Sequence, residues 1–163
     1  FLFDTTPGGA GFSAKVWDEF DNVAARADSI LTGDCCDSAC HKCLRRYDNR
    51  HLHGSLDRFL GATLLEYAQY GTTPEPNPNR VDSLTNRLTH SLKLQDDSIE
   101  LTRTSGKTDQ WTVISDSGTC QFAARSCLRR QRTDLDVALD ISDYQLTHEL
   151  PEVATAIVSE LDQ

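Results

Sequence analysis

The stretch Cys35-Cys36-Asp37-Ser38-Ala39-Cys40-His41-Lys42-Cys43 decides how the first part of this chain folds. Four of the six cysteines of the 163-residue chain fall within it. The C-x-x-C spacing of Cys40 and Cys43 lets two thiolates of one turn reach one ion, and zinc takes four such ligands in a tetrahedron. We therefore expect one structural Zn²⁺, bound by Cys35, Cys36, Cys40 and Cys43.

The fourth ligand stays open at this stage, because two adjacent cysteines seldom both bind one ion. His53, His51 or Asp34 are the alternatives for one member of the pair. A redox pair or a set of reduced core cysteines is the alternative to a metal site. The other two cysteines, Cys120 and Cys127, are too far apart to form a knuckle, so we interpret them as buried thiols.

The segments around this cysteine knuckle, residues 35–43, predict a strand, a loop and two helices. Residues 1–6 have the pattern of a short buried strand, and the three glycines of Pro7–Gly11 indicate a tight loop rather than a phosphate-binding one. Helical spacing of apolar residues predicts a helix over 13–31, with Ser13 as its N-cap, and a second helix over 55–70.

A proline-rich stretch over 71–80 predicts a linker between two units. The fold class we expect is mixed α/β: a small zinc-stabilised strand-loop-helix-knuckle-helix unit over 1–72, followed by a mixed α/β unit of unassigned role over 80–163. The elements expected in the second unit are a helix carrying Leu84, Leu88 and Leu92, paired strands at Ile99–Arg103 and Trp111–Ile114, a half-buried strand over 135–141, and a helix from Pro151 to Leu161.

The turn between the paired strands contains Ser105-Gly106-Lys107-Thr108, which ends like a Walker A motif. The position of the required upstream glycine is Leu101, however. We therefore interpret these residues as a hairpin turn and not as a nucleotide-binding loop.

Charge is unevenly distributed along the chain. The formal net charge is −9, yet residues 134–163 alone hold eight acids and no Lys or Arg. Two stretches are basic, residues 41–58 and residues 125–132. The net charge argues against a protein that coats nucleic acid, whereas the basic stretches permit local phosphate contacts.

Cellular location follows from the same composition. Bunched cysteines suit a reducing compartment, since secreted disulfide scaffolds spread theirs. The sequence has no apolar run long enough for a membrane helix. We therefore expect a soluble, cytoplasmic protein without a membrane partner.

The first basic stretch combines charged, aromatic and amide side chains beside the cysteines. Arg45, Arg46, Tyr47, Asn49 and Arg50 supply groups that suit phosphates and stacked bases. We predict that these five residues contact nucleic acid. The alternative is a solvated surface that packs on the following helix.

Several short motifs together resemble a known domain. As an ordered set over about residues 1–70, they resemble the cysteine-rich C-terminal domain of MrfA-type superfamily 2 DNA helicases, a domain type found also in DrmB of the DISARM anti-phage system. The resemblance implies a four-cysteine metal site in a protein that acts on DNA, in repair or in phage defence. The motifs are Asp4-Thr5-Thr6, Pro7-Gly8-Gly9-Ala10-Gly11, the clustered cysteines, Cys43-Leu44-Arg45-Arg46-Tyr47, Asn49, His53 and Leu56-Asp57-Arg58.

The chain departs from the pattern that this resemblance implies in one respect. A C-x-C-x-x-x-C-x-x-C pattern would place the first cysteine at position 34, where this chain has Asp34 followed by Cys35. Either the loop is one residue shorter and Cys35 binds, or another residue substitutes. A complete Walker A motif and a DEAD-type box are also absent, so we expect any ATPase upstream or on a partner.

The function we expect is that of a non-catalytic zinc-binding module in a helicase-related DNA-processing protein, where it aids DNA holding or subunit docking. The chain begins at Phe1 and contains no methionine, so we expect the remainder of a larger protein as one partner and DNA as another. One alternative is a metal-dependent nuclease domain that uses Asp136 and Asp140. Another is a protein–protein adaptor that uses the acidic C-terminal segment.

Overall fold

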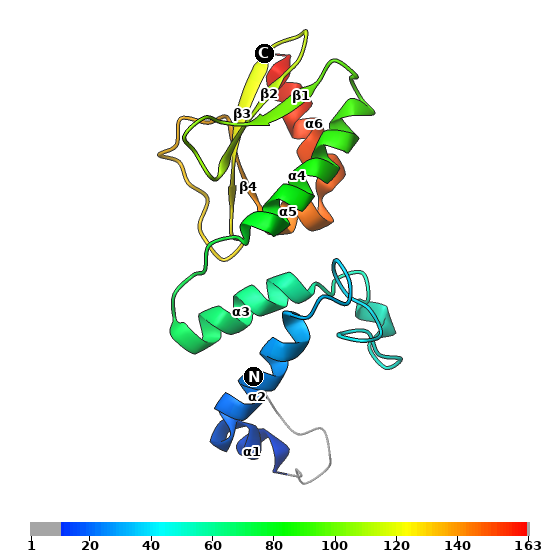
Figure 1. Cartoon of the computed structure of the whole chain (residues 1–163), viewed down its shortest axis with the longest axis vertical. Coiled ribbons are helices and arrows are strands. Elements are labelled where there is room, and N and C mark those ends of the chain that lie inside the picture. The colour runs from blue at the N-terminus through cyan, green and yellow to red at the C-terminus, as the bar shows by residue number, and fades with distance from the viewer. Residues whose placement is uncertain (1–10, 163) are drawn as a thin grey trace. The chain divides into compact units, whose positions relative to one another are not determined.

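The chain folds into two compact units, Phe1–Thr72 and Thr73–Gln163 (Figure 1). This computed structural model describes residues 11–162. The strand predicted over 1–6 and most of the loop at Pro7–Gly11 lie outside the described residues. The boundary between the two units falls inside the proline-rich stretch.

The first unit begins with two helices where the sequence predicted one. Helix α1 spans Phe12–Asp18 and helix α2 spans Phe20–Leu31, because Glu19 leaves helical geometry with φ −114° and ψ 29°. The predicted N-cap Ser13 is also wrong, since Gly11 occupies that position with φ +73°. The sequence around Glu19 contains no Gly or Pro that would have marked the break.

A third helix closes the first unit and packs against α2. Helix α3 spans Arg58–Tyr70 and begins three residues later than the predicted start at Ser55. Its start is set by Asp57, whose carboxylate accepts hydrogen bonds from the N–H groups of Phe59 (2.8 Å) and Leu60 (3.2 Å). Between the cysteines and α3 lies a short 3₁₀ helix, η1, at Arg50–Leu52.

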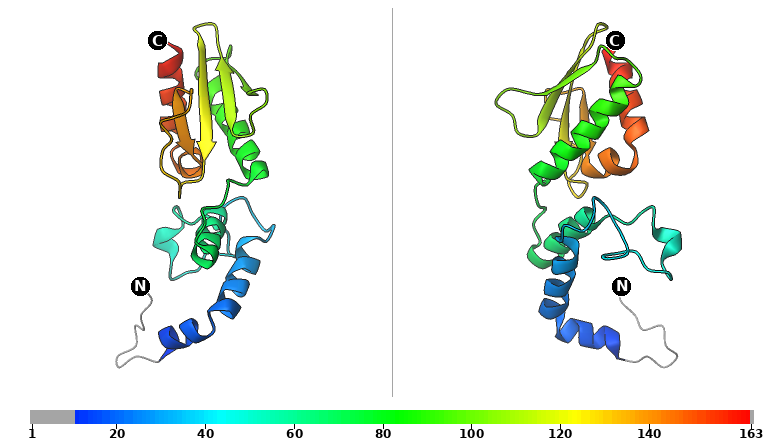
Figure 2. Two further views of the ribbon diagram at one scale, coloured as in Figure 1. Left: turned by 90° about the vertical axis from the view of Figure 1, so that its left-hand side faces the viewer. Right: turned by 45° about the vertical axis from the view of Figure 1, so that its right-hand side comes forward.

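The second unit is a four-stranded sheet with helices along one face (Figures 1 and 2). Its elements are α4 (Pro78–Lys93), β1 (Glu100–Arg103), β2 (Gln110–Ile114), β3 (Thr119–Arg125), β4 (Leu139–Ser142), α5 (Asp143–His148) and α6 (Leu150–Leu161). The strand order is β1-β2-β3-β4, antiparallel except for the parallel pair β3–β4. The core lies between this sheet and the helices, with Phe122, Leu88 and Ile157 fully buried.

The predicted paired strands and the closing helix are confirmed, whereas four other features differ from the prediction. The linker ends earlier than predicted, since α4 starts at Pro78 with Asn77 as its N-cap. The strand predicted over 135–141 is formed only from Leu139 onward. Strand β3 and helix α5 were not predicted. None of the helices within residues 11–162 combines the length and apolar character that a membrane span requires.

Candidate metal centre

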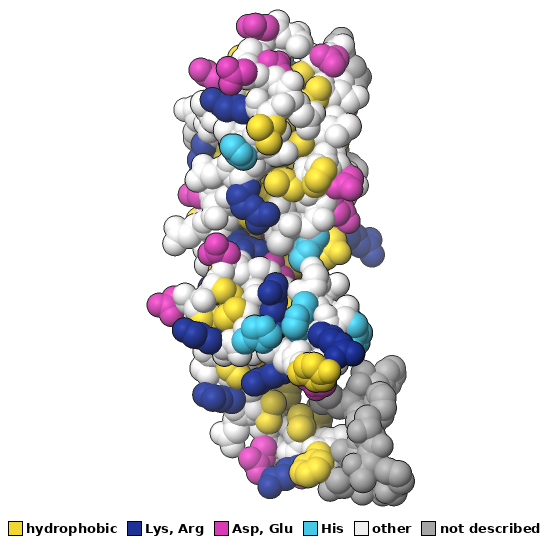
Figure 3. All heavy atoms as spheres, turned by 90° about the vertical axis from the view of Figure 1, so that its right-hand side faces the viewer, with side chains coloured by type: hydrophobic (Ala, Val, Ile, Leu, Met, Phe, Trp, Pro, Cys, Tyr) yellow, Lys and Arg dark blue, Asp and Glu magenta, His cyan; other side chains and the backbone are white. Residues whose placement is uncertain are grey.

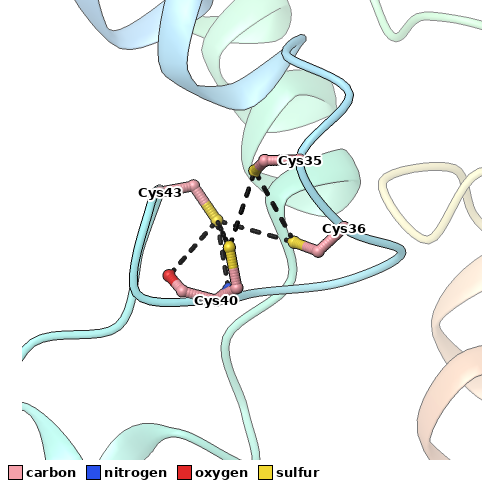
Figure 4. A group of neighbouring side chains, drawn as sticks. All are labelled: Cys35, Cys36, Cys40 and Cys43. Atoms are coloured by element: carbon pink, nitrogen blue, oxygen red, sulfur yellow. Dashed lines mark hydrogen bonds between the residues drawn. The ribbon is translucent and has the colours of Figure 1, made fainter.

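The four cysteine side chains of the knuckle point toward one another (Figure 4). The Sγ–Sγ distance is 3.7 Å for Cys36–Cys43 and for Cys35–Cys40, and 3.8 Å for Cys35–Cys36 and for Cys40–Cys43. All four sulfur atoms lie within 4.8 Å of one another. The adjacent pair Cys35 and Cys36 therefore both face the same centre.

This arrangement has the size of a zinc site. A Zn–S bond of about 2.3 Å in a tetrahedron puts neighbouring sulfur atoms about 3.8 Å apart. Four of the six sulfur–sulfur distances match this value. Soft thiolates in a tetrahedral set are the donors that select zinc, so the cluster fits the predicted Zn²⁺ in both chemistry and geometry.

The backbone of the knuckle prepares two of the thiols for a cation. The N–H of Cys40 donates to Sγ of Cys43 (3.2 Å), and the N–H of Lys42 donates to Sγ of Cys40 (3.4 Å). The hydrogen bond from Lys42 lowers the pKa of Cys40 to about 7. A turn closed by the bond from the N–H of Cys43 to the carbonyl of Cys40 (3.1 Å) holds this geometry.

Arg58 joins the knuckle to the two neighbouring helices. Its side chain is almost fully buried, with 6% of the residue exposed. Nε donates to the carbonyl of Cys36 (2.7 Å) and Nη1 donates to the carbonyl of Leu31 at the end of α2 (2.8 Å). The backbone N–H of Arg58 also bonds to the carbonyl of Ser38 (2.9 Å). Arg58 thus fixes the position of Cys36, a role that the sequence alone did not reveal.

The alternative zinc ligands lie elsewhere. His53 places Nε2 2.9 Å from the carbonyl oxygen of Arg46 and 3.0 Å from Oδ1 of Asn49. Asp34 and His51 are exposed. In the part of the chain that the structure describes, the group able to hold a metal consists of the four cysteines. Cys35 thus occupies the ligand position for which the expected pattern had a cysteine at position 34.

The five residues predicted to contact nucleic acid lie in the loop after the knuckle, and they differ in exposure. Tyr47 is 82% exposed, and the guanidinium of Arg50 lies 4.8 Å from its ring centroid. Arg46 is exposed and Arg45 is half-buried. Asn49 is occupied inside the loop, since its Oδ1 accepts from the N–H of Arg46 (2.7 Å) and its Nδ2 donates to the carbonyl of Leu44 (2.9 Å).

Histidine side chains lie in the same segment as the exposed loop residues. His41 and His51 are exposed, and the ring of His53 lies edge-on to that of His41. Figure 3 shows histidine side chains beside Lys and Arg side chains on one face of this unit. The loop thus presents cationic and aromatic groups to solvent.

The carboxylate pair considered for nuclease activity is not assembled as a metal site. Asp140 is buried and forms ion pairs with Arg125 (3.0 Å) and with Arg132 (2.9 Å). Asp136 is exposed in the preceding loop. Among residues 11–162, neither aspartate belongs to a group able to hold a metal. Asp140 is instead neutralised by two arginines.

The two cysteines outside the knuckle differ in burial. Cys120 is buried at 3% exposure, as predicted, whereas Cys127 is half-buried. Burial raises the pKa of each thiol to about 11, and the neighbouring carboxylates Glu160 and Asp143 respectively add to the shift. Neither thiol has the character of a nucleophile or a metal ligand at neutral pH.

Two comparisons with known proteins found a match. Residues 1–44, which include all four knuckle cysteines, match the family model of the MrfA Zn-binding domain. Over 74 residues, 45% of this chain, the sequence is 42% identical to Druantia protein DruE of Escherichia coli (strain UMEA 4076-1). The matched part covers only 4% of the length of that protein. No solved structure matches the chain significantly.

The family match covers the first motifs on which the resemblance was based, from Asp4-Thr5-Thr6 through Cys43 and Leu44, and ends before the motifs at 45–58. It also agrees with the four-thiol geometry, which is independent of the sequence comparison. The resemblance is thereby confirmed: residues 1–44 of this chain are similar to the MrfA Zn-binding domain, and a 74-residue part of the chain is similar to Druantia protein DruE.

Proposed function

We propose that this chain is a non-catalytic zinc module of a larger, helicase-related DNA-processing protein of phage defence or DNA repair, acting in the cytoplasm. Cys35, Cys36, Cys40 and Cys43 bind one Zn²⁺, and the loop that follows contacts nucleic acid. The observation that carries the proposal is the position of a basic and aromatic loop directly after a four-thiol site.

A structural role for the zinc follows from the ligand set. Four protein ligands complete the tetrahedron and leave no open position for a water or a substrate, which is the mark of a structural site. Residues 32–57 contain a single short 3₁₀ helix. The metal therefore stabilises the conformation of residues 32–57, where helices and strands contribute little.

The charge balance of the loop favours an anionic partner. Residues 42–50 carry four bases and one acid. A zinc ion with four thiolates has a formal charge of −2, which the nearest basic side chains offset in part. Arg46 and Arg50 remain exposed for phosphate oxygens, and Tyr47 offers a ring on which a base can stack. Asn49 shapes the loop through its internal hydrogen bonds.

The test compares two double variants of the zinc-loaded chain that lose the same charge. Arg46→Ala with Arg50→Ala removes the exposed bases of the loop, whereas Lys15→Ala with Arg26→Ala removes exposed bases from α1 and α2. We expect the loop variant to bind labelled DNA several-fold more weakly in fluorescence anisotropy. Its plot of log affinity against log salt should lose a slope of about 0.9 per lost phosphate contact on duplex DNA.

Zinc content should be the same in both variants, because neither removes a ligand. Equal affinity and an equal salt slope in the two would show that the loop is a solvated surface. The adaptor alternative would then take its place, favoured by Trp17 and Phe12, which are 81% and 68% exposed on α1.

A further inference from the structure

The second unit contains a pocket that the proposed function leaves unused. It has a volume of about 390 Å³, within the range of small-ligand sites. The segment before α4, the end of β1 and the loop after β3 enclose it. The residues that matter for its chemistry are Glu75, Arg103, Asp109, Trp111, Arg129 and Arg132.

Three arginines from separate places in the sequence line this pocket. Arg103 comes from β1, whereas Arg129 and Arg132 come from the second basic stretch, residues 125–132. The fold therefore brings two arginines of that stretch together with Arg103 around one cavity, which their positions in the sequence did not show.

Arg132 serves the fold rather than a ligand. Its guanidinium donates to Asp140 (2.9 Å), to Asp109 (2.7 Å) and to the carbonyl of Ala124 (3.1 Å). The Asp140 carboxylate is 2% exposed, so removal of Arg132 would leave a buried charge with one partner fewer. Arg132 is thus a fixed part of the wall.

Arg103 and Arg129 differ from Arg132 because their acidic partners are exposed, whereas Arg132 pairs with the buried Asp140. Arg129 pairs with Glu75 at 2.6 Å, and the Glu75 side chain is 73% exposed. Arg103 pairs with Asp82, whose side chain is 52% exposed. Ion pairs with exposed carboxylates contribute little net stability. An incoming anion can therefore replace either carboxylate at small cost.

The floor of the pocket is apolar. Trp111 is 3% exposed, and the Arg103 guanidinium lies 5.2 Å from its ring centroid. Pro78, Val81 and Ala124 complete the floor. This surface suits a compact organic group, not a bare ion.

We propose that this pocket binds a phosphate monoester of a small organic molecule, such as a mononucleotide or the phosphorylated end of a strand. Arg103 and Arg129 bind the phosphate oxygens, and the floor around Trp111 and Pro78 holds the organic part. A phosphate dianion has enough oxygen atoms and charge to accept hydrogen bonds from both guanidinium groups at once. A ligand with a single carboxylate could take the place of Glu75 or of Asp82, but not of both.

Ligand binding should also change the protease sensitivity of residues 72–77, the segment between the two units. Besides Glu75, Arg129 contacts the carbonyl of Thr73 (3.5 Å). A phosphate that takes Arg129 from Glu75 releases this segment. Residues 72–77 should then be cut faster by a protease when the ligand is bound.

The experiment titrates the zinc-loaded chain with dAMP, inorganic phosphate and deoxyadenosine, and follows the Trp111 indole and the arginine side chains by NMR. Three single variants are compared with the parent chain. Arg129→Gln removes a ligand-binding group, and Glu75→Gln removes the carboxylate that competes for it. Arg130→Gln, an exposed neighbour outside the lining, is the matched control.

The two pocket variants should change affinity in opposite directions. We expect dAMP to bind at least about tenfold more weakly to Arg129→Gln, two- to threefold more tightly to Glu75→Gln, and unchanged to Arg130→Gln. If the Arg129–Glu75 ion pair only stabilised the fold, the two variants would not change dAMP affinity in opposite directions. Deoxyadenosine should not bind, and inorganic phosphate should bind more weakly than dAMP.

Three results would overturn the proposal. The first is that dAMP shows no saturable binding. The second is that dAMP binds the Arg129→Gln variant as tightly as the parent chain. The third is that inorganic phosphate binds as tightly as dAMP, because the apolar floor would then contribute nothing to binding. An oligonucleotide with a 5′-phosphate, compared with its unphosphorylated form, then distinguishes a strand end from a free nucleotide as the source of the phosphate.

Discussion

At the scale of single residues, the six cysteines divide into two chemical classes. The density of thiols in the knuckle was enough to predict a metal site from the sequence. All four cysteines were predicted as ligands, but one member of the adjacent pair Cys35 and Cys36 was left open. The orientation of both toward the centre depends on how Arg58 holds the carbonyls of Cys36 and Ser38. Cys120 and Cys127 have raised pKa values of about 11 because they are withdrawn from water.

This division predicts the reactivity of the thiols. In the zinc-loaded chain at pH 7.5, iodoacetamide should spare the four knuckle cysteines, whose sulfur atoms the metal occupies. Cys120 and Cys127 should react slowly, since a pKa of about 11 keeps them protonated at that pH. Their labelling should rise about tenfold per pH unit as the pH approaches 11.

Peptide mapping by mass spectrometry measures the labelled fraction at each cysteine. A chelator provides the control, because it should expose the knuckle thiols without changing Cys120. Rapid labelling of Cys120 at pH 7.5 in the loaded chain would contradict the raised pKa.

At the scale of elements, Arg58 joins the end of α2, the knuckle and the start of α3. Arg58→Met keeps the apolar stem but removes the donors to the carbonyls of Leu31 and Cys36. We expect this change to destabilise the first unit by about 2–4 kcal/mol, since hydrogen bonds from a charged group are lost and buried carbonyls are left unpaired. Zinc should also be released faster to a chelator.

Arg26→Met is the matched control, since Arg26 is exposed on α2 and should change neither quantity. Zinc release is followed with a coloured chelator, and unfolding with denaturant. Equal zinc release from the two variants would show that Arg58 does not position the metal site.

The elements that sequence reasoning missed have physical causes. Strand β3 pairs with both β2 and β4. Its alternation of polar and apolar residues is broken by Ala123, which is apolar and buried between Phe122 and Ala124. The segment 135–141 does alternate. Only its end pairs with β3, whereas the residues before Leu139 form a loop.

At the scale of the whole molecule, the two units differ in what stabilises them. The core cluster of the second unit runs from Val81 to Leu161 and contains large side chains such as Phe122 and Trp111. Among the described residues of the first unit, the buried apolar residues are Ala24, Ala39 and Cys43. Since these buried residues are few and small, we expect the first unit to rely on its metal.

Metal removal should therefore separate the stabilities of the two units. A structural zinc contributes on the order of 10 kcal/mol to the folding of small domains, more than the few buried groups of the first unit can replace. After chelation, we expect a protease to cut first between residues 32 and 57 and to leave a resistant fragment that begins near Thr73. In a Trp17→Phe variant, which leaves Trp111 as the one tryptophan, the fluorescence of Trp111, which is 3% exposed, should keep its buried character during this treatment.

The control is the zinc-loaded chain under the same protease, where the first cuts should fall within residues 72–77, between the end of α3 and the start of α4. Returning zinc to the chelated chain should restore protection of the 32–57 segment, because the ligands are still present. If chelation instead exposed Trp111 together with the knuckle, the two units would share one cooperative fold. Zinc would then stabilise the second unit as well as the first, and the separate stabilities proposed for the two units would be wrong.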